Sequence, residues 1–240
     1  MDLNRIKCVI SPPFGHYLKF FSWATPIRGT FTIKRRKGII KNALKTFRYS
    51  LKRNGWINKM GLVNKGIKSQ IPFNPEHIYS ITAFNDEDWE ELYDIIPSNI
   101  VLEINLSCPN SNEINISRGV LLRFSEKYNL IVKVSSNNFY ETLDQVNFAH
   151  SCRVRVFHVG NTVKIPEGAL SGKKIQKISL QIIKFIRRNI PDAIIIGGGG
   201  IYSKEDVIAY RNAGANIFSL ATIWMTPWKV REVKKEIFRK

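Results

Sequence analysis

The sequence has few cysteines and no long apolar run. Its three cysteines are an odd number without metal-type spacing, so they indicate reduced thiols in a cytoplasmic protein, with neither a disulfide framework nor a metal site. The longest apolar runs, such as Ala193 to Ile196, have the length of a strand and fall far below the roughly 18 residues that cross a bilayer. Charged residues precede the first apolar run, so neither a secretory signal nor membrane attachment is expected.

Acidic residues are also scarce. The chain has 37 Lys and Arg against 19 Asp and Glu, a net charge of +18. Such an excess suits anionic small molecules, an acidic membrane surface or nucleic acid. The basic residues are spread along the chain in small clusters, and no basic stripe interleaved with aromatic residues is found. The pattern therefore disfavours a nucleic-acid partner but leaves it open.

The 240 residues, 44% of them hydrophobic, contain no linker rich in Pro, Gly or Ser, which predicts one domain over 1–240. Eight short runs have the apolar character of parallel strands covered on both faces. These predicted strands are Lys7–Ser11, Gly29–Lys34, His77–Ala83, Val101–Ser107, Ile131–Ser135, Arg153–Gly160, Ala193–Gly198 and Ile217–Ala221.

Helical patterns alternate with these strands. One opens at Asp86 with acidic residues in its first turn, and the others are Ser117–Tyr128, Phe139–Ser151, Ser179–Asn189, Ser203–Ala213 and Pro227–Lys240. Eight strands alternating with helices predict an α/β protein with a (β/α)8 (TIM) barrel, and an open doubly wound sheet is the alternative.

A basic insertion separates the second and third predicted strands. It includes Lys37–Gly55 and shows no clear helix or strand period. An insertion of this length above a barrel is typical of a lid or a binding loop. Because barrel active sites lie at the carboxyl ends of the strands, the reactive residues are expected just after each run.

The segment Asn105-Leu106-Ser107-Cys108-Pro109-Asn110 follows the fourth predicted strand. Its amides can hold a planar polar substrate, and a thiol with an ordinary pKa of about 8.5 becomes a usable general base after a modest downward shift. The alternative is a Ser-, Pro- and Asn-rich turn around a buried cysteine. The residues alone do not separate these two interpretations.

This segment resembles the signature of dihydroorotate dehydrogenases of the soluble class, in which the cysteine is the catalytic base. The membrane-attached class has serine at that position. Further segments along the chain match the family in order. The resemblance implies that Cys108 is catalytic and that the substrate is bound by Asn58, Met60, Gly61, Leu62, Asn105, Asn110, Asn161 and Thr162.

The resemblance also implies an FMN cofactor. Glycine runs after late barrel strands let backbone N–H groups close on a phosphate, although a run of four glycines alone is more typical of a flexible turn. The residues implied to hold FMN are Ser11, Lys34, Lys133, Gly172, Gly199, Gly200, Ala221 and Thr222. Where the family has Ala-Ser-Gly after its first strand, this chain has Ile10-Ser11-Pro12, and the proline removes a backbone donor from the flavin edge.

The implied reaction oxidises dihydroorotate to orotate in pyrimidine biosynthesis, with Cys108 taking a proton from C5 while hydride passes from C6 to flavin N5. Two alternatives stay open: a related flavin barrel acting on another dihydropyrimidine or on tRNA dihydrouridine, and a divergent barrel without catalysis. The electron acceptor (fumarate, or NAD through a partner) and a homodimer are also left open. The four histidines are interpreted as structural, although His158 stands close to Asn161 at a strand end.

Overall fold

A computed structural model describes residues 1–38, 46–59, 61–106 and 116–239. Cys108, Asn110 and Met60 lie outside these ranges, so the predictions made for these three residues concern a part of the chain that the structure does not describe.

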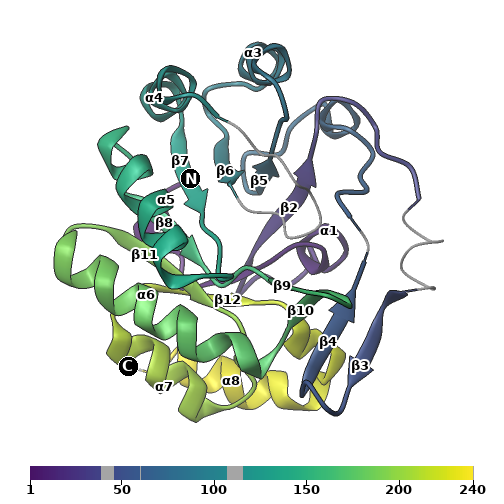
Figure 1. The fold of residues 1–240 in the computed structure, drawn as a ribbon, viewed down its shortest axis with the longest axis vertical. Helices are drawn as coiled ribbons and strands as arrows, with labels where there is room; N and C mark the ends of the chain where they lie inside the picture. Colours follow the sequence, from purple (N-terminus) through teal and green to yellow (C-terminus); the bar gives the residue numbers. More distant parts are fainter. Residues whose placement is uncertain (39–45, 60, 107–115, 240) are drawn as a thin grey trace.

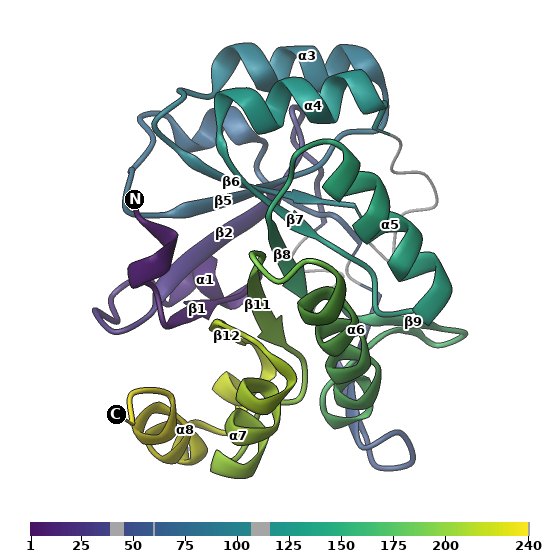
Figure 2. The ribbon, with the colours of Figure 1, turned by 90° about the vertical axis from the view of Figure 1, so that its left-hand side faces the viewer.

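Eight parallel strands close into a barrel in the order β1-β12-β11-β8-β7-β6-β5-β2, with helices around its outside (Figures 1 and 2). This confirms the predicted (β/α)8 architecture. The barrel strands are β1 (Cys8–Ile10), β2 (Thr25–Phe31), β5 (Ile78–Ile81), β6 (Val101–Asn105), β7 (Asn129–Lys133), β8 (Val156–Val159), β11 (Ile194–Gly198) and β12 (Ile217–Leu220).

The second strand was predicted with the wrong bounds. It was expected at Gly29–Lys34, but it spans Thr25–Phe31, and its pairing with β5 shifts register between Arg28 and Phe31. Proline, arginine and glycine within β2 weaken the β-branched pattern by which strands are recognised. Lys34 consequently lies beyond the end of the strand and is exposed.

The helices also follow the predicted pattern, with shifts at their ends. Asn85, Ser117, Asn138 and Ser203 each cap a helix by accepting a backbone N–H, as expected for these residue types. The α-helices are α1 (Phe14–Tyr17), α3 (Asp86–Ile95), α4 (Arg118–Lys127), α5 (Phe139–Ser151), α6 (Gln176–Asn189), α7 (Lys204–Ala213) and α8 (Val230–Ile237), and the 3-10 turns are Leu3–Arg5, Ile67–Gln70, Lys173–Ile175, Thr222–Met225 and Pro227–Lys229.

Two apolar clusters stabilise the barrel. The larger one lies between strands and helices and includes Trp89, Phe124 and Tyr210, each without appreciable exposed surface. The smaller one takes one residue from each barrel strand, which places it inside the barrel: Val9, Ile27, Ile78, Val101, Ile131, Val156, Ile196 and Ile217, joined by Leu3. The two clusters explain why the strands are apolar on both faces.

Two residues further along each strand, the barrel interior changes from apolar to polar. Since side chains alternate between the faces of a strand, residues at i+2 face the same side as the apolar layer. They are Ser11, Gly29, Ser80, Glu103, Lys133, His158, Gly198 and Ser219. This polar layer lies on the side of the carboxyl ends, where a barrel active site is expected.

A four-stranded antiparallel sheet lies beside the barrel and was not predicted as such. Its strands are β3 (Arg48–Ser50), β4 (Gly55–Asn58), β9 (Val163–Ile165) and β10 (Gly168–Ser171), in the order β3-β4-β10-β9. The β3–β4 hairpin, drawn at the lower right of Figure 1, belongs to the predicted insertion, and β9–β10 follows β8. Arg53 and Glu167 form an ion pair between the two hairpins. The insertion therefore contributes half of an ordered sheet.

Candidate active site

A pocket opens at the carboxyl end of the barrel. Residues from five barrel strands and from the end of β10 converge on it, although the chain separates them by up to two hundred residues or so. Its lining includes Ser11, Pro12, Lys133, Gly160, Asn161, Thr162, Ser171, Gly172, Ile175, Gly199, Gly200, Ile201, Ser219, Ala221 and Thr222. The geometry thus unites many of the residues that the sequence singled out.

Glycines form one wall of the pocket. Gly172, Gly199 and Gly200 all have positive φ values, of 113°, 98° and 74°. A Cβ atom on Gly200 would lie 2.8 Å from the carbonyl oxygen of Gly172 and from Cα of Lys173, so the two loops meet at backbone distance. A wall of backbone is the kind of surface that closes on a phosphate group.

Helix α7 fixes the glycine wall from outside. Asp206 accepts hydrogen bonds from the backbone N–H groups of Tyr202 and Ser203, at 2.9 and 3.1 Å, and also pairs with Lys173. The Tyr202 hydroxyl donates to the Thr222 hydroxyl at 2.5 Å. Contacts within the protein alone therefore connect the loops after β10, β11 and β12 to one another.

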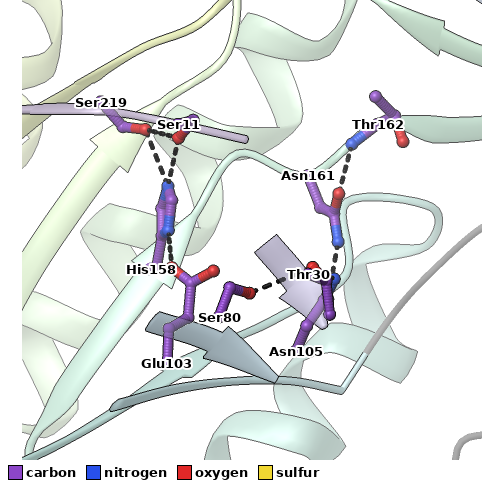
Figure 3. A network of polar contacts seen from close by, with 9 residues as sticks. All are labelled: Ser11, Thr30, Ser80, Glu103, Asn105, His158, Asn161, Thr162 and Ser219. Carbon is purple, nitrogen blue, oxygen red and sulfur yellow. Dashed lines mark hydrogen bonds and ion pairs between the residues drawn. The ribbon is translucent and has the colours of Figure 1, made fainter. Parts of the chain in front are cut away.

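A chain of amides lies on the other side of the pocket. Nδ2 of Asn161 donates to Oδ1 of Asn105 at 3.1 Å, and Nδ2 of Asn105 donates to the Thr30 hydroxyl at the same distance (Figure 3). The Thr162 backbone N–H donates to Oδ1 of Asn161, which fixes the orientation of that amide. Two oriented amides and a hydroxyl suit a planar ligand with several polar atoms.

Beneath the pocket, Glu103 and His158 form a fully buried pair. Nδ1 of His158 lies 2.5 Å from Oε2 of Glu103, and Nε2 lies 2.8 Å from the Ser219 hydroxyl (Figure 3). The Ser11 hydroxyl is 2.5 Å from that of Ser219 and 3.5 Å from Nε2. A continuous line of polar atoms thus leads from Glu103 to two hydroxyls that line the pocket.

The charges of this group balance one another. Burial alone would raise the pKa of the Glu103 carboxyl, but His158 and Lys133 outweigh it and lower that pKa to about 2. Burial lowers the pKa of His158, and Lys133 lowers it further, against the opposing effect of Glu103. The carboxylate is therefore charged, and the imidazole is neutral at neutral pH.

The structure separates the predicted site residues into three groups. Nine line the pocket (Ser11, Lys133, Asn161, Thr162, Gly172, Gly199, Gly200, Ala221 and Thr222), and Asn105 contacts it through Asn161. Four lie away from its lining: Asn58 at the end of β4, Gly61 and Leu62 beyond it, and the exposed Lys34. The third group, Met60, Cys108 and Asn110, lies outside the described residues.

Sequence reasoning missed Thr30, Glu103 and Ser219 and interpreted His158 as structural. A signal for Glu103 was available, because a glutamate within the apolar run of β6 shares a face with Asn105 two residues later. Nothing in the sequence placed Glu103 against His158, since the two are 55 residues apart.

Comparison with known proteins identifies the family. The model of the family described as dihydroorotate dehydrogenase matches residues 22–240. The chain belongs to this family. The family assignment, together with the relatives below, makes the protein an oxidoreductase that acts on a CH–CH group.

Relatives with assigned names are similar over most of the chain. The "Dihydroorotate dehydrogenase B (NAD(+)), catalytic subunit" of Caldicellulosiruptor bescii is 26% identical over 218 residues, covering 76% of this chain and 72% of the relative. The protein of the same name from Trichlorobacter lovleyi is 28% identical over 218 residues, covering 75% and 70%.

Solved structures agree with the fold. Ligand-free DHODH from Eimeria tenella superposes with a TM-score of 0.71 at 19% identity, covering 90% of this chain and 77% of that structure. At this identity the likeness establishes the barrel architecture alone.

Within the described residues, no helix has both the length and the apolar character needed to cross a bilayer.

Proposed function

We propose that this chain is a single-domain, FMN-dependent dihydroorotate dehydrogenase that oxidises dihydroorotate to orotate in the cytoplasm. The observation that carries the proposal is the pocket, which gathers nine residues predicted to bind substrate or cofactor from six separate segments of the chain. Family membership and the names of the relatives support the same reaction.

The residues of the pocket fit FMN. The backbone wall at Gly172, Gly199 and Gly200 would hold the phosphate, because glycines let backbone N–H groups approach it. A side chain at Gly200 would collide with the backbone of Gly172 and distort this wall. Lys133, 7% exposed at the end of β7, would place a cation beside the isoalloxazine ring. When bound, FMN supplies the acceptor for the substrate hydride.

Asn161 and Asn105 would orient the pyrimidine ring, because their amides are already fixed by Thr162 and Thr30. Asn110, Asn58 and the turn at Met60, Gly61 and Leu62 remain proposed contributors from the resemblance. Cys108, two residues beyond Leu106, is proposed as the base that removes the proton from C5 of dihydroorotate. Holding base and substrate together makes the proton transfer effectively unimolecular.

A partner is part of the proposal. The named relatives are catalytic subunits of an NAD-linked enzyme, which supports an electron-transfer partner for this chain as well. The net charge of +18 suits an acidic partner surface and would steer an anionic substrate towards the protein.

The test uses the purified protein. We expect bound flavin, and we expect its visible absorbance to bleach anaerobically when dihydroorotate is added. Cys108→Ala should retain flavin and lose roughly 10²–10⁴-fold in the bleaching rate, the usual contribution of a positioned base. Protein that takes up no FMN would refute the cofactor, and bleaching of Cys108→Ala at the normal rate would refute the base.

A further inference from the structure

Glu103, His158 and Ser219 were given no role in the reaction proposed above, yet a buried line of polar atoms connects them to Ser11 at the pocket. Glu103 and His158 have no exposed surface, and Ser219 and Ser11 are each 4% exposed. The four residues come from β6, β8, β12 and the end of β1, so the line crosses the interior of the barrel (Figure 3). We call it the Glu103–Ser11 chain.

The charges around this chain keep His158 neutral. In the polar layer of the barrel, β5 contributes Ser80, β6 contributes Glu103 and β7 contributes Lys133, so one carboxylate faces one ammonium group. A protonated His158 would add a second positive charge to a site closed to water, which is costly. The neutral ring has one N–H, and it points to Glu103, since an ionised carboxylate only accepts hydrogen bonds.

This tautomer fixes the direction of both hydroxyl groups. Nε2 of His158 can only accept, and the hydroxyl nearest to it, at 2.8 Å, is that of Ser219. With its proton directed at Nε2, the Ser219 oxygen accepts from Ser11 at 2.5 Å. The oxygen of Ser11 then presents a lone pair to the pocket that it lines.

Protonation of His158 reverses the line. Nε2–H would donate to Ser219, Ser219 would donate to Ser11, and Ser11 would present its O–H to the pocket. One proton is transferred in total, and its source is solvent in the pocket that Ser11 lines. This proton, added at Ser11, displaces the Ser11 proton to Ser219, whose own proton moves to Nε2. The resulting imidazolium is paired with Glu103, 2.5 Å away.

We propose that the Glu103–Ser11 chain is a proton relay that switches the pocket face of Ser11 between hydrogen-bond acceptor and donor, with His158 as its positioning residue. The inference rests on the proposed FMN site. Two-electron reduction of a bound flavin would change the hydrogen bonding of its polar edge, because N5 would gain the hydride and turn from a hydrogen-bond acceptor into a donor. Because the Ser11 hydroxyl can act either as donor or as acceptor, it would match both the oxidised and the reduced flavin.

The resting state can be tested without FMN. In ¹⁵N-histidine NMR spectra of the cofactor-free protein near neutral pH, we expect His158 to be neutral with its proton on Nδ1. A proton on Nε2, or an imidazolium under these conditions, would overturn the relay.

The coupling is tested with FMN added. We expect FMN to shift the His158 signals, and the midpoint potential of the bound flavin, plotted against pH, to change slope at the pKa of His158. Ser219→Ala and His158→Gln should each abolish that change of slope, whereas His150→Gln, near the end of α5, should keep it. Ser219→Ala removes only one oxygen, so it tests the relay even if His158→Gln does not fold.

The outcomes separate the two proposals. If FMN fails to bind, the proposed function is refuted, and with it the relay, which acts on bound flavin. If FMN binds and dihydroorotate bleaches it, but the His158 signals and the slope are the same in wild type and Ser219→Ala, the relay alone is overturned.

Discussion

Glu103 and His158 occupy positions where apolar side chains would stabilise the barrel more simply. A buried carboxylate costs several kcal/mol unless charge and hydrogen bonds offset it. Here His158 supplies a hydrogen bond at 2.5 Å, and Lys133 supplies the opposite charge. This pair is costly, and Ser219 and Ser11 connect it to the pocket. A role in the chemistry of the site therefore explains the pair better than a contribution to stability.

A single methyl group added at Gly200 is expected to reduce FMN affinity more than it reduces the stability of the fold. Gly200→Ala forces a side chain into a φ of 74° and brings its Cβ to 2.8 Å from the Gly172 oxygen. We expect a loss of about 1–2 kcal/mol in stability from the backbone conformation and a larger loss of FMN affinity, because the phosphate wall must open. Thermal unfolding and fluorescence titration with FMN measure the two effects.

Gly119→Ala is the matched control. Gly119 lies in α4, where an added Cβ meets nothing within 4 Å. Alanine in a helix should stabilise by roughly 0.5–1 kcal/mol and leave FMN affinity unchanged. Equal FMN affinity in Gly200→Ala and Gly119→Ala would contradict the proposed phosphate site.

The sequence could predict only part of the site. Lys133, Asn161 and the glycines belong to segments with recognisable order, so resemblance placed them in one pocket. Ser219 and His158 could not be placed, because a barrel strand is buried on both faces and its apolar pattern does not reveal which face is interior. His158 and Glu103 become partners because their strands, β8 and β6, both pair with β7 in the folded barrel.

At the scale of elements, the barrel strands were predictable and the small sheet was not. The barrel strands are short apolar runs, for example β8, whose residues are all buried. Strand β3 has two exposed residues and β9 has one, and both are three residues long. Short half-exposed strands carry little periodic signal. The two hairpins join into one sheet only through β4 and β10, which are more than a hundred residues apart.

The cap of α7 supports the glycine wall as well as the helix. Ser203 and Asp206 form a capping box three residues after Gly200. Ser203→Ala should lower the free energy of unfolding by about 1 kcal/mol and weaken FMN binding, since the loop after β11 loses its anchor. Chemical denaturation measures the change in the free energy of unfolding, and FMN titration measures the change in affinity.

Asn85→Ala provides the comparison for that change. Asn85 caps α3 by accepting from Asp88 N–H at 2.8 Å, and it does not line the pocket. We expect a similar loss of stability with unchanged FMN affinity. Parallel losses of affinity in both variants would show that the α7 cap has no special relation to the site.

For the whole molecule, the buried pair makes stability depend on pH in a defined direction. The pKa of His158 is lower in the folded state than its ordinary 6.5, so the unfolded chain binds more protons and stability falls as pH drops below about 6.5. The pKa of Glu103 falls from 4.5 to about 2, so its contribution is complete above 4.5 and is lost as pH falls towards 2. His16 and His77, whose pKa values are also lowered by burial, act in the same sense as His158.

We therefore expect the Tm to decline steadily from about pH 7 to about pH 5, and His158→Gln to reduce that slope. The control is His150→Gln, which replaces a histidine outside the Glu103–Ser11 chain. A steeper slope in His158→Gln would mean that the folded protein prefers the imidazolium. Differential scanning calorimetry across this range decides between the two states.

The antiparallel sheet joins the loop after β2 to the loop after β8, two segments that the chain separates by about a hundred residues. Its two hairpins can each form early, but their pairing closes a long loop and is unfavourable until the barrel strands between them are aligned. Pairing of β4 with β10 is therefore expected late in folding, after barrel closure. The pairing of β4 with β10 positions Ser171 and Gly172 in the pocket wall. The binding site would therefore form only after nearly all of the chain has folded.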